Sequence, residues 1–366
     1  MKPLSILHLN TERGWRGGER QTFLLARELA RRGHRNVVAC RPGEALDQKC
    51  RDAGLETFPV SPWSELAIWE AGRLRRFLRS NRVEILHAHT GHAVGLGALA
   101  FPGGGARLVA TRRVDFPVRG GPGRWKYGRP AAWAAVSQSV ASRLIAAGVA
   151  PARVRVIPSG VDSAAYPSRR DRDRLRRDRG IDSATRVILH AGALDESKDQ
   201  ATLLRAFARI APRLADARLL ILGDGPLRGA LAEIARKEGV AERVSFLGHR
   251  ADVLEYMALA DLVAFPSRKE GLGTVLLDAL AIGVPTAATA TGGIPDIYGS
   301  PTAPELSPVG DATAFAANLE RGLDPDEGAR RVARGRERVG GFTVTAMADA
   351  YERFYDEVIC RDSPRF

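Results

Sequence analysis

The fold of this chain is decided by residues 219–226, LLILGDGP. The first four are apolar and predict a short buried strand, and the two glycines after them allow a tight turn at its carboxyl end. The amphipathic stretch that follows predicts a helix. A strand, a glycine turn and a helix in direct succession are typical of an open parallel α/β sheet, in which ligands bind at the carboxyl ends of the strands.

Similar short apolar runs recur along the chain in two series, separated by longer amphipathic stretches. The first series comprises residues 36–40, 83–87, 107–110, 133–136 and 154–157, and the second comprises residues 187–190, 219–222, 244–247, 262–265 and 286–288. Strands that alternate with helices predict parallel sheets covered by helices on both faces. We therefore expect an α/β chain with two Rossmann-like domains.

A highly charged segment, residues 168–182, separates the two series. It contains seven arginines, at positions 169, 170, 172, 174, 176, 177 and 179, mixed with aspartates. Mixed-sign charge favours a solvated linker or a short exposed helix, and the alternative is a basic surface that meets anionic lipid. With this boundary, the expected domains are residues 1–165 and 166–341, followed by a C-terminal segment, residues 342–366.

The last predicted helix, residues 344–358, carries an apolar stripe formed by Met347, Tyr351, Phe354 and Tyr355. Their spacing places them on one side of the helix, and that side needs another surface to cover it. We expect this helix to pack back on the N-terminal domain.

The composition bounds the class of partner. The 366 residues carry a formal net charge of +13, with 55 Lys and Arg against 42 Asp and Glu, which favours anionic partners such as phosphates or acidic lipid headgroups. Aromatic residues make up only 6% and no recognition module is evident, which argues against nucleic acid. The three cysteines, Cys40, Cys50 and Cys360, are odd in number and lack paired spacing, so we expect neither disulfides nor a thiolate metal site.

Targeting signals are not recognisable in the sequence. The start runs directly into a strand-like stretch without the charged and apolar regions of a signal peptide, and no run of about 18 apolar residues occurs. We expect a cytoplasmic protein, with a peripheral position on the inner face of the cytoplasmic membrane as the alternative.

Two further glycine-containing segments stand at predicted helix starts. Gly17 and Gly18 open an amphipathic helix whose N-terminus suits a phosphate, although paired glycines are also common in ordinary turns. Residues 266–273, PSRKEGLG, join a predicted strand to the helix 274–281. A loop with one acid, two cations and two glycines beside a helix N-terminus predicts a diphosphate site.

In this order and spacing, the motifs of the chain resemble those of the retaining glycosyltransferases of family 4. The resemblance covers nearly the whole chain and rests on Gly17-Gly18-Glu19, Val136-Ser137, residues 157–162, Lys198, residues 223–226, residues 246–248, residues 270–278 and residues 292–295. It implies the GT-B fold, with two facing Rossmann-like domains and an interdomain cleft. It also implies transfer of a sugar, with retention, from a nucleoside-diphosphate donor such as a UDP-sugar to an acceptor hydroxyl.

The resemblance assigns roles on the donor side. Glu270 is expected to hydrogen-bond the donor sugar, Lys198 to neutralise the departing β-phosphate, and Asp278 to contact the ribose hydroxyls. The other expected donor-binding residues lie in the glycine loops, at the helix start and beside the nucleobase: Gly17, Gly18, Gly223, Gly225, His249, Arg268, Gly271, Gly273, Thr274 and Val275. Fixed cations and helix N–H groups can replace the metal that other transferases need, so we expect no metal and no cofactor.

Two residues depart from the family pattern. Ala193 stands five positions before Lys198, where an arginine is common, and this removes a bidentate phosphate contact. Arg268 or Lys269 is the hypothetical replacement for that charge. Asp278 stands where the family usually has glutamate, and it can accept the same hydrogen bonds if its helix lies slightly closer.

The acceptor side is expected in the N-terminal domain, where this fold normally binds acceptors. Many relatives have a histidine shortly after the strand at residues 107–110, whereas this chain has Asp115 there. We predict Asp115 as the catalytic polar group, with His89 or His92 as reserves, although a loop aspartate can equally cap a turn or pair with an arginine. The expected acceptor-binding residues are Glu19, His89, Arg112, Arg113 and Trp125.

The loop that contains Trp125, residues 119–129, is basic and aromatic. This composition suits an acidic or lipid-linked acceptor, and the alternative is an ordinary surface loop. His87 and His89 alternate along one strand, and we expect them to point to opposite faces and to form no metal pair.

The sequence thus favours a glycosyltransferase that acts in cell-envelope glycan or lipopolysaccharide synthesis. Two alternatives stay open. Another GT-B enzyme, such as a sugar-nucleotide epimerase or a phosphorylase, would give product from the donor alone. A non-catalytic nucleotide-sugar binding protein is suggested by Ala193 and by the net charge of +13.

Overall fold

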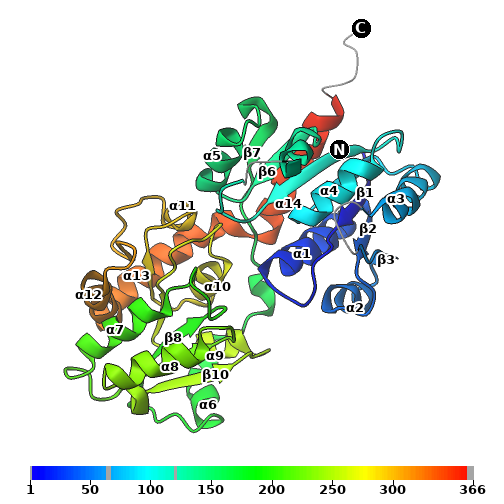
Figure 1. Cartoon of the computed structure of the whole chain (residues 1–366). Helices are drawn as coiled ribbons and strands as arrows, with labels where there is room; N and C mark the ends of the chain where they lie inside the picture. The colour runs from blue at the N-terminus through cyan, green and yellow to red at the C-terminus, as the bar shows by residue number, and fades with distance from the viewer. Residues whose placement is uncertain (1, 63–66, 119–121, 361–366) are drawn as a thin grey trace. The chain divides into compact units, whose positions relative to one another are not determined.

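The computed structural model describes residues 2–62, 67–118 and 122–360. Contacts between residues divide the chain into two units (Figure 1). The first comprises Met1–Gly160 and Thr343–Phe366, and the second comprises Val161–Phe342. Each unit contains one wholly parallel sheet packed between helices. The expected fold class, two Rossmann-like α/β domains, is confirmed.

The first unit is built on a seven-stranded sheet with the order β3-β2-β1-β4-β5-β6-β7. Its strands are β1 Ser5–Leu9, β2 Arg35–Cys40, β3 Glu56–Pro59, β4 Ile85–Ala88, β5 Arg107–Arg112, β6 Ala132–Ala135 and β7 Val154–Val156. Its helices are α1 Gly17–Arg31, α2 Ala45–Asp52, α3 Ile68–Ser80, α4 Gly91–Ala100, α5 Gln138–Ala146 and α14 Val344–Cys360, with the 3-10 turns η1 Pro122–Gly128 and η2 Pro151–Arg153. The strand order reverses between β1 and β4, which is where open sheets of this kind place ligands.

Helix α14 returns to the first unit at the end of the chain. Its stripe of Met347, Tyr351, Phe354 and Tyr355 is buried in one core with Leu25 of α1 and with side chains of β1, β4 and β5. Burial of such large side chains is worth roughly 1.5–3 kcal/mol each, so α14 is an integral part of the first unit.

The second unit is built on a six-stranded sheet with the order β10-β9-β8-β11-β12-β13. Its strands are β8 Arg186–Ala191, β9 Ala217–Leu222, β10 Val244–Gly248, β11 Leu262–Phe265, β12 Thr286–Thr289 and β13 Leu306–Ser307. Its helices are α6 Arg172–Arg177, α7 Gln200–Ile210, α8 Arg228–Lys237, α9 Val253–Leu259, α10 Thr274–Ile282, α11 Ile294–Tyr298, α12 Ala312–Leu323 and α13 Pro325–Val339. Short 3-10 turns complete it: η3 Ser163–Ala165, η4 Arg169–Asp171, η5 Ala241–Arg243 and η6 Gly340–Phe342.

The strands of the second sheet contribute side chains to two separate cores. Ile188 and Leu219 lie in a core with α7 and α12, whereas Leu189 and Leu220 lie in another with α9 and α10. Because successive side chains of a strand point to opposite faces, these buried pairs show that both faces of the sheet are covered.

The arginine-rich segment, residues 168–182, is only partly the exposed stretch that its composition suggested. Arg170, Arg174 and Arg177 are exposed, whereas other arginines of the segment make internal contacts. Arg176 is 1% exposed, and its guanidinium pairs with Asp261 at 2.6 Å while donating to backbone carbonyls. Arg172 also pairs with Asp261, and Arg179 pairs with Asp252 and Glu255. Much of the positive charge therefore anchors η4 and α6 to α9 and to the sheet of the second unit.

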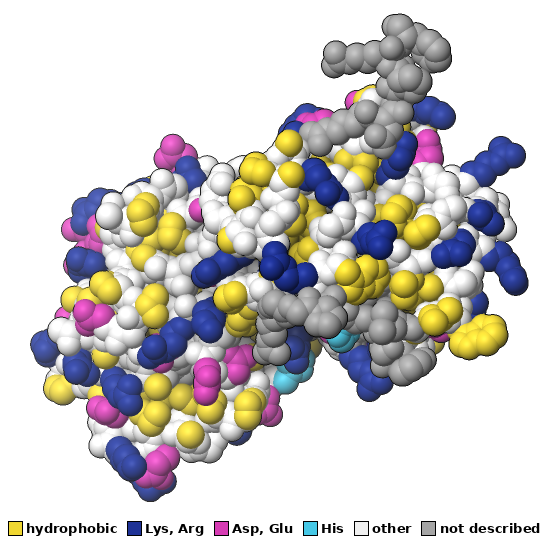
Figure 2. All heavy atoms as spheres, turned by 45° about the horizontal axis from the view of Figure 1, so that its top comes forward, with side chains coloured by type: hydrophobic (Ala, Val, Ile, Leu, Met, Phe, Trp, Pro, Cys, Tyr) yellow, Lys and Arg dark blue, Asp and Glu magenta, His cyan; other side chains and the backbone are white. Residues whose placement is uncertain are grey.

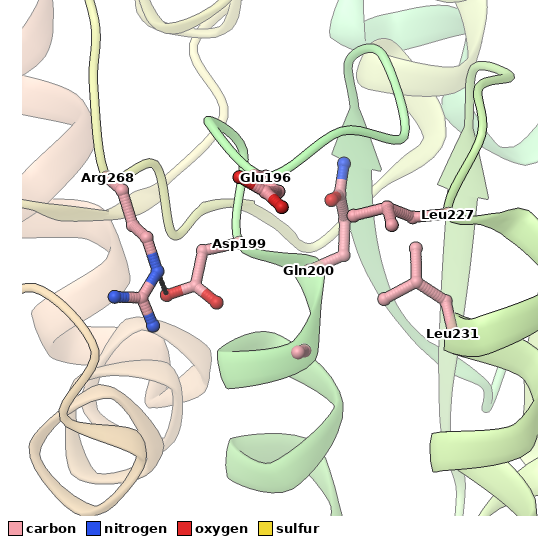
Figure 3. A pocket seen from close by; sticks show the side chains of 7 residues that line it. Glu196, Asp199, Gln200, Leu227, Leu231 and Arg268 are labelled. Carbon is pink, nitrogen blue, oxygen red and sulfur yellow. Dashed lines mark ion pairs between the residues drawn. The ribbon is translucent and has the colours of Figure 1, made fainter.

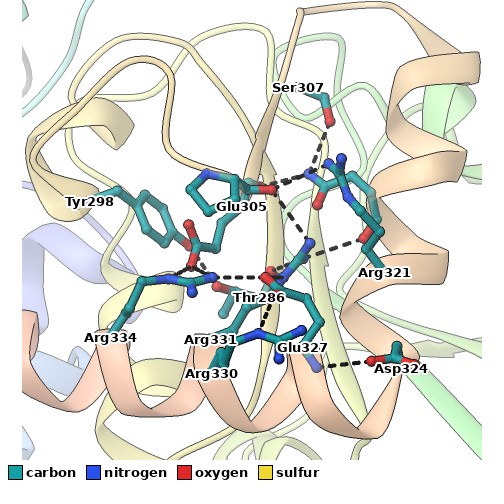
Figure 4. A network of polar contacts seen from close by, with 12 residues as sticks. Thr286, Tyr298, Glu305, Ser307, Arg321, Asp324, Glu327, Arg330, Arg331 and Arg334 are labelled. Atoms are coloured by element: carbon teal, nitrogen blue, oxygen red, sulfur yellow. Dashed lines mark hydrogen bonds and ion pairs between the residues drawn. The ribbon is translucent and has the colours of Figure 1, made fainter.

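A second buried arginine, Arg331, fastens α13 to the far strands of the same sheet (Figure 4). It is 1% exposed and donates to the carbonyls of Thr286 and Asn318 and to the carboxylate of Glu327. Glu327 also accepts from Arg334, which in turn donates to the buried carboxylate of Glu305. The Arg331 guanidinium thus links α13 to a carbonyl of β12 and to a carbonyl of α12, and Arg334 joins the carboxylates of Glu305 and Glu327.

Surface features are consistent with the composition. Lys and Arg side chains are scattered over the face shown in Figure 2. In the part of the chain that the structure describes, no helix combines the length and apolar character needed to cross a bilayer. Cys40, Cys50 and Cys360 are free thiols, and burial raises the pKa of Cys40 and of Cys50 to about 12.

Candidate functional site

The candidate site of the second unit lies at the carboxyl edge of its sheet. Parallel strands bring the loops after β8, β9, β11 and β12 to this edge. A Cβ on Gly223 would lie 2.0 Å from the carbonyl oxygen of Gly192, and a Cβ on Gly225 would lie 2.5 Å from that of Leu194. Only glycine allows this approach, so both glycines are needed to pack the loop after β9 against the loop after β8.

A third close approach supports the acidic loop after β11. The φ angle of Gly292 is +53°, and a Cβ there would lie 1.8 Å from the carbonyl oxygen of Glu270. The same carbonyl accepts a hydrogen bond from the backbone of Gly293 at 3.1 Å. The backbone of Glu270 is therefore held directly by the loop that precedes α11.

Lys198 and Glu270 meet at this edge as an ion pair between Nζ and Oε2. Their side chains are 19% and 16% exposed, so both groups are largely desolvated yet reachable from outside. The Lys198 ammonium also lies 5.2 Å from the centre of the Phe265 ring, which favours a cation there. The pair joins the loop after β8 to the loop after β11.

Arg268 makes a second link between the same two loops. Its Nε lies 2.9 Å from Oδ2 of Asp199, and its backbone N–H donates to the carbonyl of Ser197 at 2.8 Å. Figure 3 shows this pair beside a hollow of about 380 Å³, whose other lining residues are Glu196, Gln200, Ala201, Leu227 and Leu231. Ala193 is exposed, and its carbonyl accepts from the Gln200 amide at 2.8 Å.

The predicted diphosphate cradle is a helix start in the structure. Gly273, with a φ of +98°, is the N-cap of α10, so Thr274 and Val275 form the first turn of the helix. Gly271 is buried in the loop just before it. The positive end of the helix dipole and the unpaired amides of a first turn favour an anion at such a position.

Two other predicted donor-side residues occupy different surroundings. Asp278 is 4% exposed on α10 and accepts a hydrogen bond from the Tyr166 hydroxyl. His249 is exposed and follows Gly248, which ends β10 with a φ of +69°. The structure therefore gives Asp278 an internal partner and leaves His249 at the surface.

The first unit contains a buried histidine cluster at its switch point. On β1, Nδ1 of His8 lies 3.0 Å from Nε2 of His89, and Nε2 of His8 lies 2.9 Å from Oδ1 of Asn36. His87 lies 2.7 Å from both Tyr355 Oη and Thr111 Oγ1. The expectation that His87 and His89 point to opposite faces was wrong, because their rings are 3.9 Å apart and residues two apart on a strand share a face.

The chemistry of this cluster does not fit a bound metal ion. The three histidines each offer a nitrogen within 4.8 Å of the others, but those nitrogens are engaged in the hydrogen bonds just described. The Arg113 guanidinium also lies 3.4 Å from Nδ1 of His89, which opposes a second cation. Burial lowers the pKa of His8 to about 4 and lowers the pKa values of His87 and His89 well below 6.5. We interpret the cluster as a neutral polar core.

Glu19 and Arg113 lie near this cluster. Glu19 is 3% exposed, and its carboxylate accepts the backbone N–H of Arg16 at 2.9 Å, which caps α1 where Gly17 and Gly18 form its first turn. Burial raises the pKa of Glu19, whereas it lowers the pKa of Arg113. Both charges are thus held at an energetic cost at the carboxyl edge of the first sheet, which is the pattern expected of functional groups.

The other residues predicted on the acceptor side are held by local contacts. Asp115 is 9% exposed and accepts from Ser139 at 2.7 Å and from Arg143 at 3.3 Å, both on α5. Arg112 donates to the Tyr127 hydroxyl at 3.0 Å. Trp125 is 36% exposed and lies beneath Arg129. Residues 119–121 of the predicted loop lie outside the described residues.

The structure therefore brings Lys198, Arg268 and Glu270 to one edge together with the start of α10. Asp115 is directed to α5 instead of to His89 or Arg113. Sequence reasoning missed Asp199, although a short polar residue directly before an amphipathic stretch was a signal for a special backbone position.

Comparisons with known proteins identify glycosyltransferases as relatives of this chain. Residues 15–165 match the family model described as Glycosyltransferase Family 4, and residues 185–324 match the model described as Glycosyl transferases group 1. The chain is 32% identical over 211 residues to the N-acetyl-alpha-D-glucosaminyl L-malate synthase of Bacillus anthracis, a match that covers 57% of this chain and 55% of that protein. The chain thus spans about half the length of the curated relatives it matches.

Two solved structures show the same fold at low sequence identity. Anabaena Alr3699/HepE in complex with UDP and glucose has a TM-score of 0.82 and 20% identity, and the match covers 97% of this chain and 100% of that one. WaaG, a glycosyltransferase involved in lipopolysaccharide biosynthesis, has a TM-score of 0.70 and 19% identity, with coverage of 96% and 99%.

Proposed function

The chain belongs to the GT-B glycosyltransferases, and from that premise we propose that it transfers a sugar from a nucleoside-diphosphate donor to an acceptor hydroxyl. The observation that carries the proposal is the Lys198–Glu270 pair at the carboxyl edge of the second sheet, next to the N-terminus of α10. An ammonium, a carboxylate and a helix start together can recognise the two halves of such a donor.

Each group has a distinct task in this proposal. Cleavage of the bond between sugar and diphosphate builds negative charge on the departing β-phosphate. The Lys198 ammonium and the first-turn amides of α10 stabilise that charge in a largely desolvated site, where such interactions are strong. The Glu270 carboxylate accepts hydrogen bonds from sugar hydroxyls and orients the ring.

We further propose a UDP-sugar as donor, retention of the anomeric configuration and a metal-independent reaction. The UDP and glucose of the Anabaena protein support the first point, and the family 4 motifs support the second. The fixed cations at the edge support the third. A role in cell-envelope glycan synthesis is supported by the structural likeness to WaaG and by an excess of surface cations that suits an anionic acceptor.

The test is a panel of UDP-, GDP- and ADP-sugars without acceptor or metal. Binding is measured by thermal shift, and hydrolysis is measured by the nucleoside diphosphate that is released. Both are measured for wild type, for Glu270→Gln and for the control Glu242→Gln, an exposed residue at the amino end of β10. We expect one donor to raise the melting temperature, with a shift that grows with the logarithm of the donor's excess over Kd. Hydrolysis should fall at least about 100-fold in Glu270→Gln and stay unchanged in Glu242→Gln.

Other outcomes select the alternatives. Rearranged sugar or a phosphorolysis product from the donor alone would favour another GT-B chemistry. Binding without any turnover, in the presence of a broad set of acceptors, would favour a non-catalytic binding protein. A stereochemical assay of the product by NMR decides between retention and inversion.

We also propose that an anionic membrane surface is a partner, at the start of α3. Ile68 and Trp69 are 76% and 90% exposed there, and Arg73, Arg76 and Arg79 follow on exposed positions of the same helix. Exposed tryptophan beside arginines is the composition of helices that lie in a membrane interface, where each cation contributes about 1 kcal/mol. Trp69→Ala should weaken co-sedimentation with phosphatidylglycerol vesicles, whereas Ile145→Ala, at an exposed position of α5, should not.

A further inference from the structure

The residue that follows Lys198 has an unusual backbone conformation. Asp199 has φ 48° and ψ 44°, in the left-handed region, and among the described non-glycine residues only Arg82 shares a positive φ. A residue with a Cβ occupies this region at a cost of about 1 kcal/mol, and aspartate and asparagine tolerate it best. Such a conformation persists only where the surroundings enforce it.

The Asp199 side chain is held from two directions. It is buried, and its Oδ2 accepts the Thr202 hydroxyl of α7 at 2.7 Å. The same oxygen lies 2.9 Å from Nε of Arg268, as the dashed line in Figure 3 shows. One carboxylate oxygen therefore fixes the start of α7 to the loop after β11.

The backbones of the two loops are joined at the same place. The carbonyl of Ser197 accepts both the Arg268 N–H at 2.8 Å and the Lys269 N–H at 3.2 Å. Lys198 is thus fixed on both sides, by the Ser197 carbonyl and by the Asp199 carboxylate. Its partner Glu270 follows directly after the two residues that make these contacts.

We propose that Asp199 and Arg268 are positioning residues that hold the Lys198 ammonium and the Glu270 carboxylate in register. The inference rests on the proposed function, and it gives Arg268 a role different from direct replacement of the missing phosphate contact at Ala193. The left-handed turn at Asp199 sets the direction in which the Lys198 side chain leaves the backbone. The Arg268 link keeps that turn at a fixed distance from the loop that carries Glu270.

The first measurement is the acylation rate of Lys198, read by mass spectrometry, because it needs no sugar donor. Lys237, whose side chain is 74% exposed, serves as the internal reference. We expect Lys198 in the wild type to react about 10-fold more slowly than Lys237, because its side chain is only 19% exposed and its ammonium is paired with Glu270. The ammonium of Lys237 also has a carboxylate neighbour, Glu233 at 3.8 Å, but that pair is exposed to solvent. Asp199→Asn and Arg268→Gln should each raise the Lys198 rate several-fold.

The matched control is Arg205→Gln, which removes another arginine of the second unit whose carboxylate partner is Glu238. This control should leave the Lys198 rate unchanged, and all variants should keep the melting temperature of the wild type within a few degrees. Unchanged protection of Lys198 in Asp199→Asn and in Arg268→Gln would overturn the inference, whether or not any sugar donor is turned over.

Donor hydrolysis then separates positioning from direct phosphate contact. If Asp199 and Arg268 act through one link, each single variant should lower kcat about 10- to 100-fold with little change in KM. The kcat of the double variant should then be no lower than that of the less active single variant. A large rise in KM confined to Arg268→Gln would show that this side chain binds the donor itself, which would overturn the positioning role. If the wild-type chain hydrolyses no donor while Lys198 is still protected from acylation, the proposed function is contradicted. The inference that Asp199 and Arg268 position Lys198 would still stand.

Discussion

At the scale of single residues, the Lys198–Glu270 pair lies between two loops that Asp199 and Arg268 also join. The sequence motifs selected Lys198 and Glu270, and the structure pairs them. Neither the left-handed Asp199 nor its link to Arg268 could be read from the motifs, because both depend on contacts between loops far apart in the sequence. Asp115 was predicted from its position after a strand, but its carboxylate lies against Ser139.

Gly292 provides a test at this scale. Its φ is +53°, and a Cβ added there would lie 1.8 Å from the Glu270 carbonyl oxygen, so Gly292→Ala should destabilise the second unit by about 2 kcal/mol or more. Gly229→Ala is the control, since a Cβ there meets nothing within 4 Å and the position is helical. The control should be neutral or stabilising by roughly 0.5–1 kcal/mol. Equal urea midpoints for both variants would contradict the argument.

At the scale of elements, hydrophobic periodicity identified most strands and helices. The charge pattern, however, was a poor guide to which arginines are buried. The arginine-rich segment looked solvated because its sequence mixes both signs, yet Arg176 is among the most buried side chains of the chain. A sequence does not reveal that Asp261, far along the chain, lies within reach of that arginine. Arginine can be buried where backbone carbonyls and a carboxylate satisfy its donors together.

Arg331 on α13 is a second buried arginine whose donors are satisfied by carbonyls and a carboxylate, and its contribution to stability can be tested. Arg331→Met keeps much of the volume but leaves the carbonyls of Thr286 and Asn318 without this donor. We expect a loss of about 3 kcal/mol or more in the free energy of unfolding, measured by urea denaturation. Arg330→Met, at an exposed neighbouring position, should change it by less than about 0.5 kcal/mol. A small effect at both positions would show that water replaces the lost donor.

At the scale of the whole molecule, the two sheets were predictable because alternating strands and helices permit few arrangements. The arrangement of the buried histidines was harder to predict from the sequence. Misjudging the faces of His87 and His89 concealed a cluster that also includes His8. His190 is a further buried histidine in the second unit, and burial lowers its pKa to about 4.

These histidines predict how stability depends on pH. Their pKa values are depressed in the folded chain, so their contribution is complete above pH 6.5 and is lost as pH falls toward 4. Each should cost about 1 kcal/mol per pH unit in that window. The first unit, with three of them, should weaken more steeply than the second. Urea unfolding at pH 7.5, 6 and 5 measures how the free energy of unfolding changes with pH. The variant His190→Gln should reduce this pH dependence for the second unit only. A slope of zero would be incompatible with neutral buried histidines.

The chain enters and leaves the second unit through adjacent segments, since the backbone N–H of Val161 donates to the carbonyl of Phe342 at 2.8 Å. During translation, the first unit therefore lacks α14 until all of Val161–Phe342 has been synthesised. At about 5–20 residues per second this interval lasts on the order of 10 to 40 seconds. Throughout it, the apolar surface of α1 and of the neighbouring strands lacks its cover. The nascent first unit should thus be the part that recruits chaperones, while the inserted unit completes its fold on the ribosome before it.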